Sequence, residues 1–197
     1  METVRTFIAI LLPDEIRLAL AFARKPFSNE RSTVRWEGTD KLHITLKFLG
    51  DVEVQMISQL ETVLRDELRS CPERTVTLSE WGFFPHREAA RLVFAAPARS
   101  DLRCLDDIAG RVENSCASLG MEKETRPFHP HVTIGRTKST RTKSTAGTAL
   151  IKRIENTTLQ SLFFPCTEIA VMRSVLLPTG SRYETQFTIP LKSQELQ

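Results

Sequence analysis

The chain has 197 residues and 41% hydrophobic content, which suffices for one domain with a well-buried core. Its formal net charge of +3 permits an anionic substrate and does not resemble the dense basic stripe of a duplex-binding protein, although net charge alone decides neither point. No apolar run approaches the roughly 18 residues that span a bilayer, no signal-like segment precedes the first predicted strand, and the four cysteines form no C-x-x-C pair, so we expect a cytoplasmic protein with reduced thiols and no membrane partner.

The first half of the chain mixes strand and helix patterns. Residues 4–12 are apolar and β-branched, which predicts a buried strand, and Pro13 suits the first turn of a helix after it. A polar loop then precedes a short predicted strand at 34–36, and a longer strand follows over 41–50. From 54 to 69, apolar side chains recur at the spacing of an amphipathic helix.

The second half repeats this order. Strands are predicted at 75–78 and 92–95, and the aromatic segment 81–87 between them predicts a turn. Ser100-Asp101 predicts the N-cap of a helix that Gly120 stops. The apolar face of that helix consists of Leu102, Leu105, Ile108, Val112, Cys116 and Leu119.

The last third of the chain is less regular. Residues 137–148 are rich in Ser, Thr and Lys without a hydrophobic period, so they are either a solvated linker or a mobile basic loop at the mouth of a site. A short helix is predicted near 150–162. Two closing strands, 167–177 and 185–191, are predicted around a turn at 178–180.

Two segments share one tripeptide pattern. His43-Ile-Thr45 lies within Lys41-Leu-His-Ile-Thr-Leu-Lys-Phe-Leu-Gly50, and His131-Val-Thr133 lies within Arg126-Pro-Phe-His-Pro-His-Val-Thr-Ile-Gly-Arg136. Each belongs to a strand, helix, strand unit, and that unit occurs twice. The pattern therefore predicts an α+β fold with an internal duplication and one two-part site.

Side chains alternate between the two faces of a strand, so each histidine shares a face with the threonine two residues later. On the first strand the same alternation places Lys47 on the polar face and Phe48 on the apolar face. Lys47 is thus either a further site residue or simply solvated.

Two imidazoles facing one space can act as a base and an acid in the same displacement, because the pKa of free histidine is about 6.5. Each threonine hydroxyl can donate a hydrogen bond to an oxyanion. This set suits a phosphate better than a carbonyl, since neither motif places a Ser or Cys nucleophile beside its base.

A metal site is a competing interpretation. His129 and His131 share a strand face, and His43 could complete three nitrogen ligands. No carboxylate or thiolate is placed to complete the set, so we expect no metal and no cofactor. His86 has no matching context and is predicted to lie in a surface loop.

With their flanking residues, the two motifs resemble the two-histidine (2H) phosphoesterase superfamily. Trp36 followed by Leu42 to Gly50, and then Arg126 to Arg136, is similar to the RNA 2′,3′-cyclic phosphodiesterase branch, historically called 2′-5′ RNA ligases. The stretch Ser174 to Tyr183 also resembles that branch, so the resemblance covers nearly the whole chain.

The resemblance implies that residues 1–197 form a single domain of two intimately packed lobes related by pseudo-twofold symmetry. Two antiparallel-rich sheets would line a central cleft, with the helices outside. The resemblance also implies metal-independent hydrolysis of RNA or nucleoside 2′,3′-cyclic phosphates to 2′-phosphates, with His43 as the acid and His131 as the base, although the residues alone leave these two roles open.

Further site residues follow from the matched motifs. Arg136 lies five residues after His131, an odd spacing that points it away from the site on a regular strand, but a bulge at Gly135 would turn it back to bind phosphate. Arg126 and Phe128 are candidates for holding phosphate and base. Trp36 and Tyr183 are candidates for stacking a nucleobase, with buried packing as the open alternative.

The expected partners are RNA ends or nucleotides that carry a 2′,3′-cyclic phosphate, and we expect a monomer. The reverse reaction, 2′-5′ ligation of RNA, is implied as a minor activity. The alternative from another class is a non-catalytic nucleotide- or RNA-binding protein that uses the same cleft for recognition only.

Overall fold

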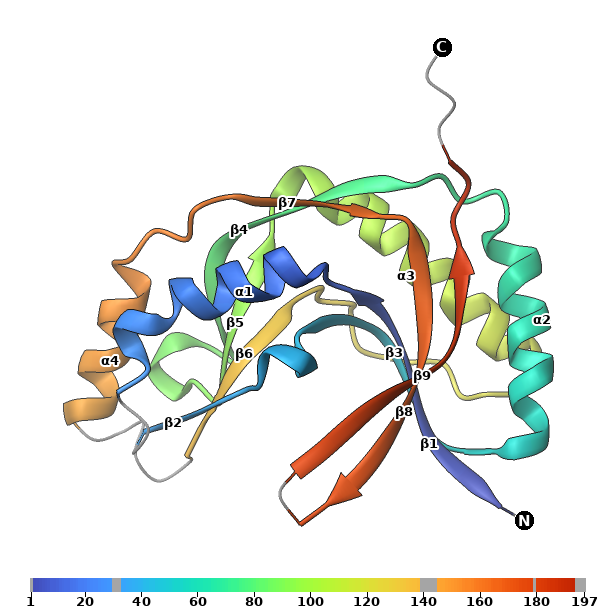
Figure 1. The fold of residues 1–197 in the computed structure, drawn as a ribbon, viewed down its shortest axis with the longest axis horizontal. Coiled ribbons are helices and arrows are strands. Elements are labelled where there is room, and N and C mark those ends of the chain that lie inside the picture. Colours follow the sequence, from blue (N-terminus) through green and yellow to red (C-terminus); the bar gives the residue numbers. More distant parts are fainter. Residues whose placement is uncertain (1, 30–32, 139–144, 179, 194–197) are drawn as a thin grey trace.

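The computed structural model describes residues 2–29, 33–138, 145–178 and 180–193, which form nine strands and four α-helices (Figure 1). The strands are β1 (Thr3–Leu11), β2 (Val34–Trp36), β3 (His43–Glu53), β4 (Arg74–Phe84), β5 (Leu92–Pro97), β6 (Val132–Thr137), β7 (Leu162–Cys166), β8 (Glu168–Leu177) and β9 (Gly180–Pro190). The helices are α1 (Asp14–Ala23), α2 (Ile57–Leu68), α3 (Arg99–Ser118) and α4 (Thr145–Glu155).

The two histidine strands lie at the centre of the sheet. The strand order is β7-β4-β5-β6-β3-β1-β8-β9, with β2 paired to β6, and every ladder between these strands is antiparallel. Within the described ranges, β3 and β6 pair through one residue each, Ile44 and Val132. Four strands lie on each side of this junction, in the order β3-β1-β8-β9 in one half and β6-β5-β4-β7 in the other, counted outward. This equivalence confirms the predicted duplication. The two halves are joined into one continuous sheet.

The four helices cover one face of this sheet. Helices α2 and α3 pack against each other and against β9 and β3, while α1 lies beside β7 and α4 beside β4 (Figure 1). We call this the helix face. It carries the main core, in which Ile44, Val132 and Ile134 are fully buried. The other side, which carries both histidine motifs, is called the open face.

Several predicted boundaries were wrong; strand β9, for example, begins at Gly180 and not at residue 185. Cross-strand pairing explains two further differences, and apolar packing explains a third. The predicted turn at 81–87 is strand β4 as far as Phe84, because Trp81 and Phe83 pack on the helix face and Phe84 pairs with Leu92. Strand β3 does not end at Gly50 but continues to Glu53, with Gly50 at a φ of +70° where the register against β1 shifts. The helix predicted at 150–162 is α4, which ends at Glu155.

Apolar packing accounts for this third difference. Leu150, Ile151 and Ile154 fill a second core cluster and fix α4 five residues earlier than predicted. The following residues are then free to form β7, which the sequence did not reveal and which pairs with β4.

None of the helices formed by the described residues combines the length and the apolar character required to cross a membrane.

Candidate active site

The pair that joins the two halves also brings the two motifs together. In antiparallel pairing, the neighbours of a paired residue face the neighbours of its partner in reverse order. Because Ile44 pairs with Val132, His43 comes beside Thr133 and Thr45 comes beside His131. The histidines are therefore diagonal neighbours, a relation that in regular ladders corresponds to about 7–8 Å. Ile44 and Val132 are buried on the helix face, so the four polar side chains share the open face.

Each imidazole is held by the same kind of contact, a hydrogen bond to the backbone carbonyl two residues earlier. Nδ1 of His43 lies 2.7 Å from the carbonyl oxygen of Lys41, and Nδ1 of His131 lies 2.7 Å from that of His129. A carbonyl oxygen can only accept, so Nδ1 carries the proton in both rings. Nε2 is then the atom that gains and loses the proton, and the duplicated fold presents two such atoms in equivalent positions.

Aromatic rings from equivalent strands support the two imidazoles. On β1, Phe7 lies 5.0 Å from the ring of His43, and on β5, Phe94 lies 5.2 Å from the ring of His131, both measured between centroids. Tyr183 adds an edge contact to His43 at 5.4 Å. Opposite Phe94, Gly82 leaves the space that the ring occupies, because a Cβ atom at Gly82 would overlap it.

Both histidine strands bulge at the same place. The register of β3 on β1 passes from Thr45 directly to Lys47, and that of β6 on β5 passes from Thr133 directly to Gly135. One residue is inserted after each threonine, which reverses the alternation beyond it. Phe48 and Arg136, each five residues after its histidine, are thereby brought to the open face.

The bulge in β6 confirms the predicted re-aiming of Arg136. The Arg136 side chain is half-exposed, and its charge lowers the pKa of both His43 and His131. Gly135 has a second role, because a Cβ there would come within 2.6 Å of Val34 and 2.8 Å of Trp36 on the helix face.

The bulge in β3 makes the predicted faces of Lys47 and Phe48 wrong. Lys47 is 7% exposed and turns to the helix face, where its Nζ lies 2.7 and 2.9 Å from the two carboxylate oxygens of Glu113. It also donates to the carbonyl of Glu122. Phe48 takes the open face, is 73% exposed, and lies 5.9 Å from the ring of Phe7.

Glu37 orients Arg136. Its Oε1 accepts from Nε of Arg136 at 3.0 Å, and the Glu37 side chain is 16% exposed. Binding through Nε leaves the two terminal nitrogens of the guanidinium available for an anion. Glu37 is itself held, because its carbonyl oxygen accepts from Arg24.

Burial lowers the pKa of both imidazoles below the ordinary value. For His43 the positive charges of His131 and Arg136 add to the lowering, and the hydrogen bond to Lys41 and the charge of Glu37 oppose it. For His131 burial is again the largest cause, with Arg136 and His129 adding to it and the carbonyl of His129 opposing it. The charge of Arg136 lowers the pKa of both rings, so both imidazoles face the same guanidinium.

The two threonines differ in their present contacts. The hydroxyl of Thr45 lies 3.0 Å from Nε2 of His43, to which it can donate. No such bond joins Thr133 to His131 in the described part of the chain, and the Thr133 side chain is partly exposed. The pairing of Ile44 with Val132 places both threonines on the open face with the imidazoles.

The remaining candidates are distributed unevenly. Tyr183 lies at the site against His43 and Phe7, and burial raises its pKa. Trp36 lies on the helix face, where it packs against both core clusters, which favours the packing alternative. Phe128 is half-buried against the main core. Arg126 is exposed and paired with Glu124 at 2.8 Å, away from the contacts that hold the imidazoles.

The other histidines and the basic loop fall outside this group. His86 is exposed, as predicted, and lies 3.1 Å from Glu88. The exposed His129 contributes its backbone carbonyl to His131. Residues 139–144 of the predicted loop, including Arg141 and Lys143, lie outside the described residues.

Sequence reasoning missed four residues that shape the site: Phe7, Phe94, Glu37 and Gly82. Each acts through a tertiary contact that local sequence patterns do not reveal. A partial signal exists for Phe94, which alternates with the buried Val93 and Ala95 on a strand that was predicted.

The fold and the paired motifs define a class of protein: this chain belongs to the 2′-5′ RNA ligase superfamily, whose family profile matches residues 14–176. Among its curated relatives is the RNA 2′,3′-cyclic phosphodiesterase of Methanothermobacter thermautotrophicus, 27% identical over 180 residues that cover 91% of this chain and 95% of the relative. The RNA 2′,3′-cyclic phosphodiesterase of Escherichia coli is 34% identical over 139 residues, covering 70% of this chain and 74% of that protein.

A solved structure agrees with this assignment. E. coli LigT complexed with 3′-AMP matches 96% of this chain and 99% of its own, with a TM-score of 0.75 at 27% sequence identity.

Proposed function

We propose that this protein hydrolyses 2′,3′-cyclic phosphate ends of RNA or nucleotides to 2′-phosphates, without a metal, by acid and base catalysis from His43 and His131. The observation that carries the proposal is the duplicated histidine geometry. Two Nε2 atoms, each defined by a carbonyl bonded to Nδ1, lie on one face as diagonal neighbours. The phosphodiesterase names of the relatives support the same reaction.

In the proposed step, Nε2 of one neutral imidazole takes a proton from water as the water oxygen forms a bond to phosphorus. The bond from phosphorus to O3′ breaks, and Nε2–H of the other, protonated imidazole gives its proton to O3′. We assign His43 as the acid and His131 as the base on the family resemblance; the Nδ1 contacts of the two rings are equivalent and support either order.

The charge on the phosphate is stabilised by Arg136 through its terminal nitrogens, while Glu37 holds Nε. Thr45 and Thr133 donate to the non-bridging oxygens, and Thr45 leaves His43 to do so. Tyr183, at the edge of His43, is placed to contact the terminal nucleoside. We also propose Arg126, Phe128 and Trp36 as substrate contacts; in this structure Arg126 is paired with Glu124, and Phe128 and Trp36 pack against the core.

Ligation is the same chemistry with a different nucleophile. If the 5′-hydroxyl of a second RNA replaces water, the same base and acid form a 2′-5′ phosphodiester. We propose it as a minor activity, since water competes at far higher concentration.

We also propose that the protein acts as a cytoplasmic monomer. Its four cysteines are free, and burial raises the pKa of each thiol. Light scattering tests the oligomeric state.

Turnover of a nucleoside 2′,3′-cyclic phosphate in excess chelator, with the product identified by phosphorus NMR, tests the proposed function. A 2′-phosphate product is expected. Binding of the substrate without turnover would favour the alternative, a non-catalytic binder, and activity that chelator removes and zinc restores would favour the three-histidine metal site.

A further inference from the structure

A row of four side chains crosses the open face next to the histidines. Phe84 of β4 pairs with Leu92 of β5, Leu92 pairs with Arg136 of β6, and Arg136 pairs with Arg35 of β2. Directly paired residues of neighbouring strands point to the same face. Their immediate neighbours Phe83, Val93 and Val34 belong to the core cluster on the helix face, which places the row on the other side.

This row lies one step beyond the catalytic residues. The preceding row on the same three strands is Gly82, Phe94 and Thr133, and Phe94 contacts His131. Arg136 belongs to both groups, because it is a member of the outer row and its charge reaches both imidazoles. The part of a substrate that is attached to a phosphate at the histidines can therefore lie over this row.

The charges of the row are not balanced within the protein. Like charges directly opposite each other on neighbouring strands are destabilising. Glu37 offsets Arg136, whereas the exposed side chain of Arg35 makes no ion pair or hydrogen bond in the part of the chain that the structure describes. One guanidinium on the open face is thus left for an external anion.

The apolar end of the row is also uncovered. Phe84 is 54% exposed although its strand neighbours Phe83 and Trp81 are packed against the core. An exposed aromatic ring and a free guanidinium on one rigid sheet surface form the usual combination for single-stranded nucleic acid, in which a base stacks on the ring and a phosphate pairs with the cation.

We infer that this row binds the nucleotide that precedes the cyclic phosphate, with its phosphodiester on Arg35 and its base on Phe84 and Leu92. This inference rests on the proposed function and names its substrate class: the end of a single-stranded RNA, in preference to a free nucleoside cyclic phosphate.

The test compares a dinucleotide that ends in a 2′,3′-cyclic phosphate with the corresponding nucleoside 2′,3′-cyclic phosphate. In Phe84→Ala, kcat/KM for the dinucleotide should fall roughly tenfold relative to that for the nucleoside, mainly through KM. Arg35→Gln should change the same ratio by about threefold to tenfold and should reduce the slope of log KM against log salt for the dinucleotide by about 0.7. Phe84→Leu keeps an apolar side chain at this position, so kcat/KM for the dinucleotide should fall only by the part that base stacking on the ring contributes.

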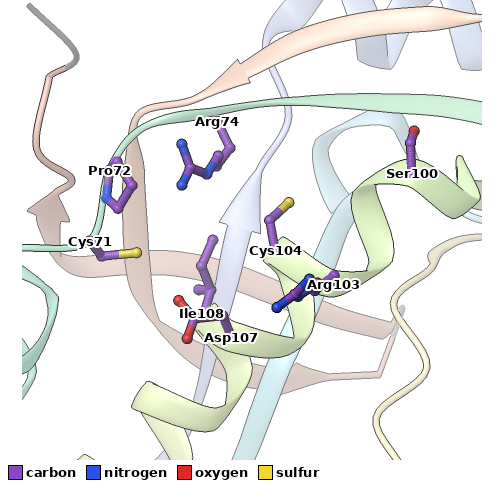
Figure 2. A pocket seen from close by; sticks show the side chains of 8 residues that line it. All are labelled: Cys71, Pro72, Arg74, Ser100, Arg103, Cys104, Asp107 and Ile108. Atoms are coloured by element: carbon purple, nitrogen blue, oxygen red, sulfur yellow. The ribbon is translucent and has the colours of Figure 1, made fainter.

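Two matched controls lie outside the row. The side chain of Arg74 also makes no ion pair or hydrogen bond among the described residues. Arg74 lines a cavity of about 430 Å³ between α3 and the start of β4, at the opposite end of that strand from Phe84 (Figure 2). Arg74→Gln removes the same charge there. Phe22→Ala removes a 73% exposed ring on α1. Neither should change the ratio of the two substrates.

Equal losses of kcat/KM on both substrates, or no loss on either, would overturn the inference. In the first case the row would bind the terminal nucleotide, and in the second it would bind no part of the substrate. If the unmodified protein turned over neither substrate, the proposed function would fail by itself. The inference that the row binds the preceding nucleotide would then be tested by calorimetry, with the dinucleotide 2′-phosphate and the nucleoside 2′-phosphate as ligands of the same variants. Equal Kd values for the two ligands would reject it.

Discussion

The two Nδ1 contacts define what each catalytic atom can do. Because backbone carbonyls fix both rings as Nδ1–H, removal of either imidazole deletes one complete proton transfer and leaves the other ring in place. Each His→Ala substitution, at His43 or His131, should lower kcat by about 100-fold to 10,000-fold with little change in substrate binding.

The double variant should lose much less than the product of the single losses, since the concerted path is already broken in each single variant. Thr45→Ala and Thr133→Ala should be milder and serve as references for the loss of one hydrogen bond. A loss of less than about threefold in kcat in either histidine variant would contradict the mechanism. Steady-state kinetics on a nucleoside cyclic phosphate provide the measurement.

The lowered pKa values set the pH dependence. One imidazole must be neutral and the other protonated, so kcat/KM should follow a bell whose maximum lies between two apparent pKa values of the free enzyme. Burial lowers both, which moves this maximum to the acid side of the ordinary histidine value of about 6.5. The bound phosphate anion favours the protonated rings, so the maximum of kcat should lie at higher pH than that of kcat/KM. A profile flat from about pH 5 to 9 would remove the histidines from the proton transfers.

At the scale of the elements, β4 and β5 together position His131, because Gly82 of β4 leaves space for the ring of Phe94 on β5, which contacts the imidazole. In Gly82→Ala the added methyl must displace the ring of Phe94, which supports the imidazole. We expect a loss of stability of about 1–3 kcal/mol together with a lower kcat.

The matched control is Gly110→Ala on α3, where a Cβ meets no atom within 4 Å. That exposed helix position should gain up to about 1 kcal/mol and keep its activity. Urea unfolding and kcat measured on the two variants distinguish strain at Phe94 from a general effect of alanine; equal behaviour would contradict the assigned contact.

Lys47 ties β3 to the segment that leads to the second motif. It binds Glu113 of α3 and the carbonyl of Glu122, and Glu113 also accepts from the backbone of Glu124. Lys47→Met should destabilise the fold by about 3–5 kcal/mol, because it leaves the Glu113 carboxylate without its cation in a largely buried place.

The double variant Lys47→Met with Glu113→Leu removes both charges and should recover part of that loss. Denaturant unfolding of the two single variants and the double variant gives the coupling. Additive losses would show that the pair is not coupled.

The sequence indicated the two histidine strands, the threonines beside them and the duplication, because these depend on local alternation and on a repeated pattern. Arg136 was also predicted, since a glycine before it suggested the bulge. Lys47 and Phe48 were placed on the wrong faces, because the bulge at Leu46 arises from the register of β3 on β1 and no glycine marks it. Glu37 and Phe94 were missed because their roles come from side-chain contacts with Arg136 and His131, which are far away in the sequence.

At the scale of the whole molecule, one sheet runs through both halves, and helices of each half cover it. The prediction that residues 1–197 form a single domain remains to be tested. We expect one unfolding transition, with equal calorimetric and van't Hoff enthalpies, because neither half can release its edge of the sheet without exposing core residues of the other. Two resolved transitions in differential scanning calorimetry would show that the lobes are separate folding units.

The matching bulges bear on which isomer the enzyme makes. A pocket with true twofold symmetry would accept a cyclic phosphate in two orientations, related by exchange of O2′ and O3′, and would release a mixture of regioisomers. The position five residues after each histidine breaks that equivalence, with a cation at Arg136 and an exposed apolar ring at Phe48. The cation fixes where the anionic oxygens of the phosphate lie, so we expect a single ring oxygen to face the acid and a single regioisomer to be released.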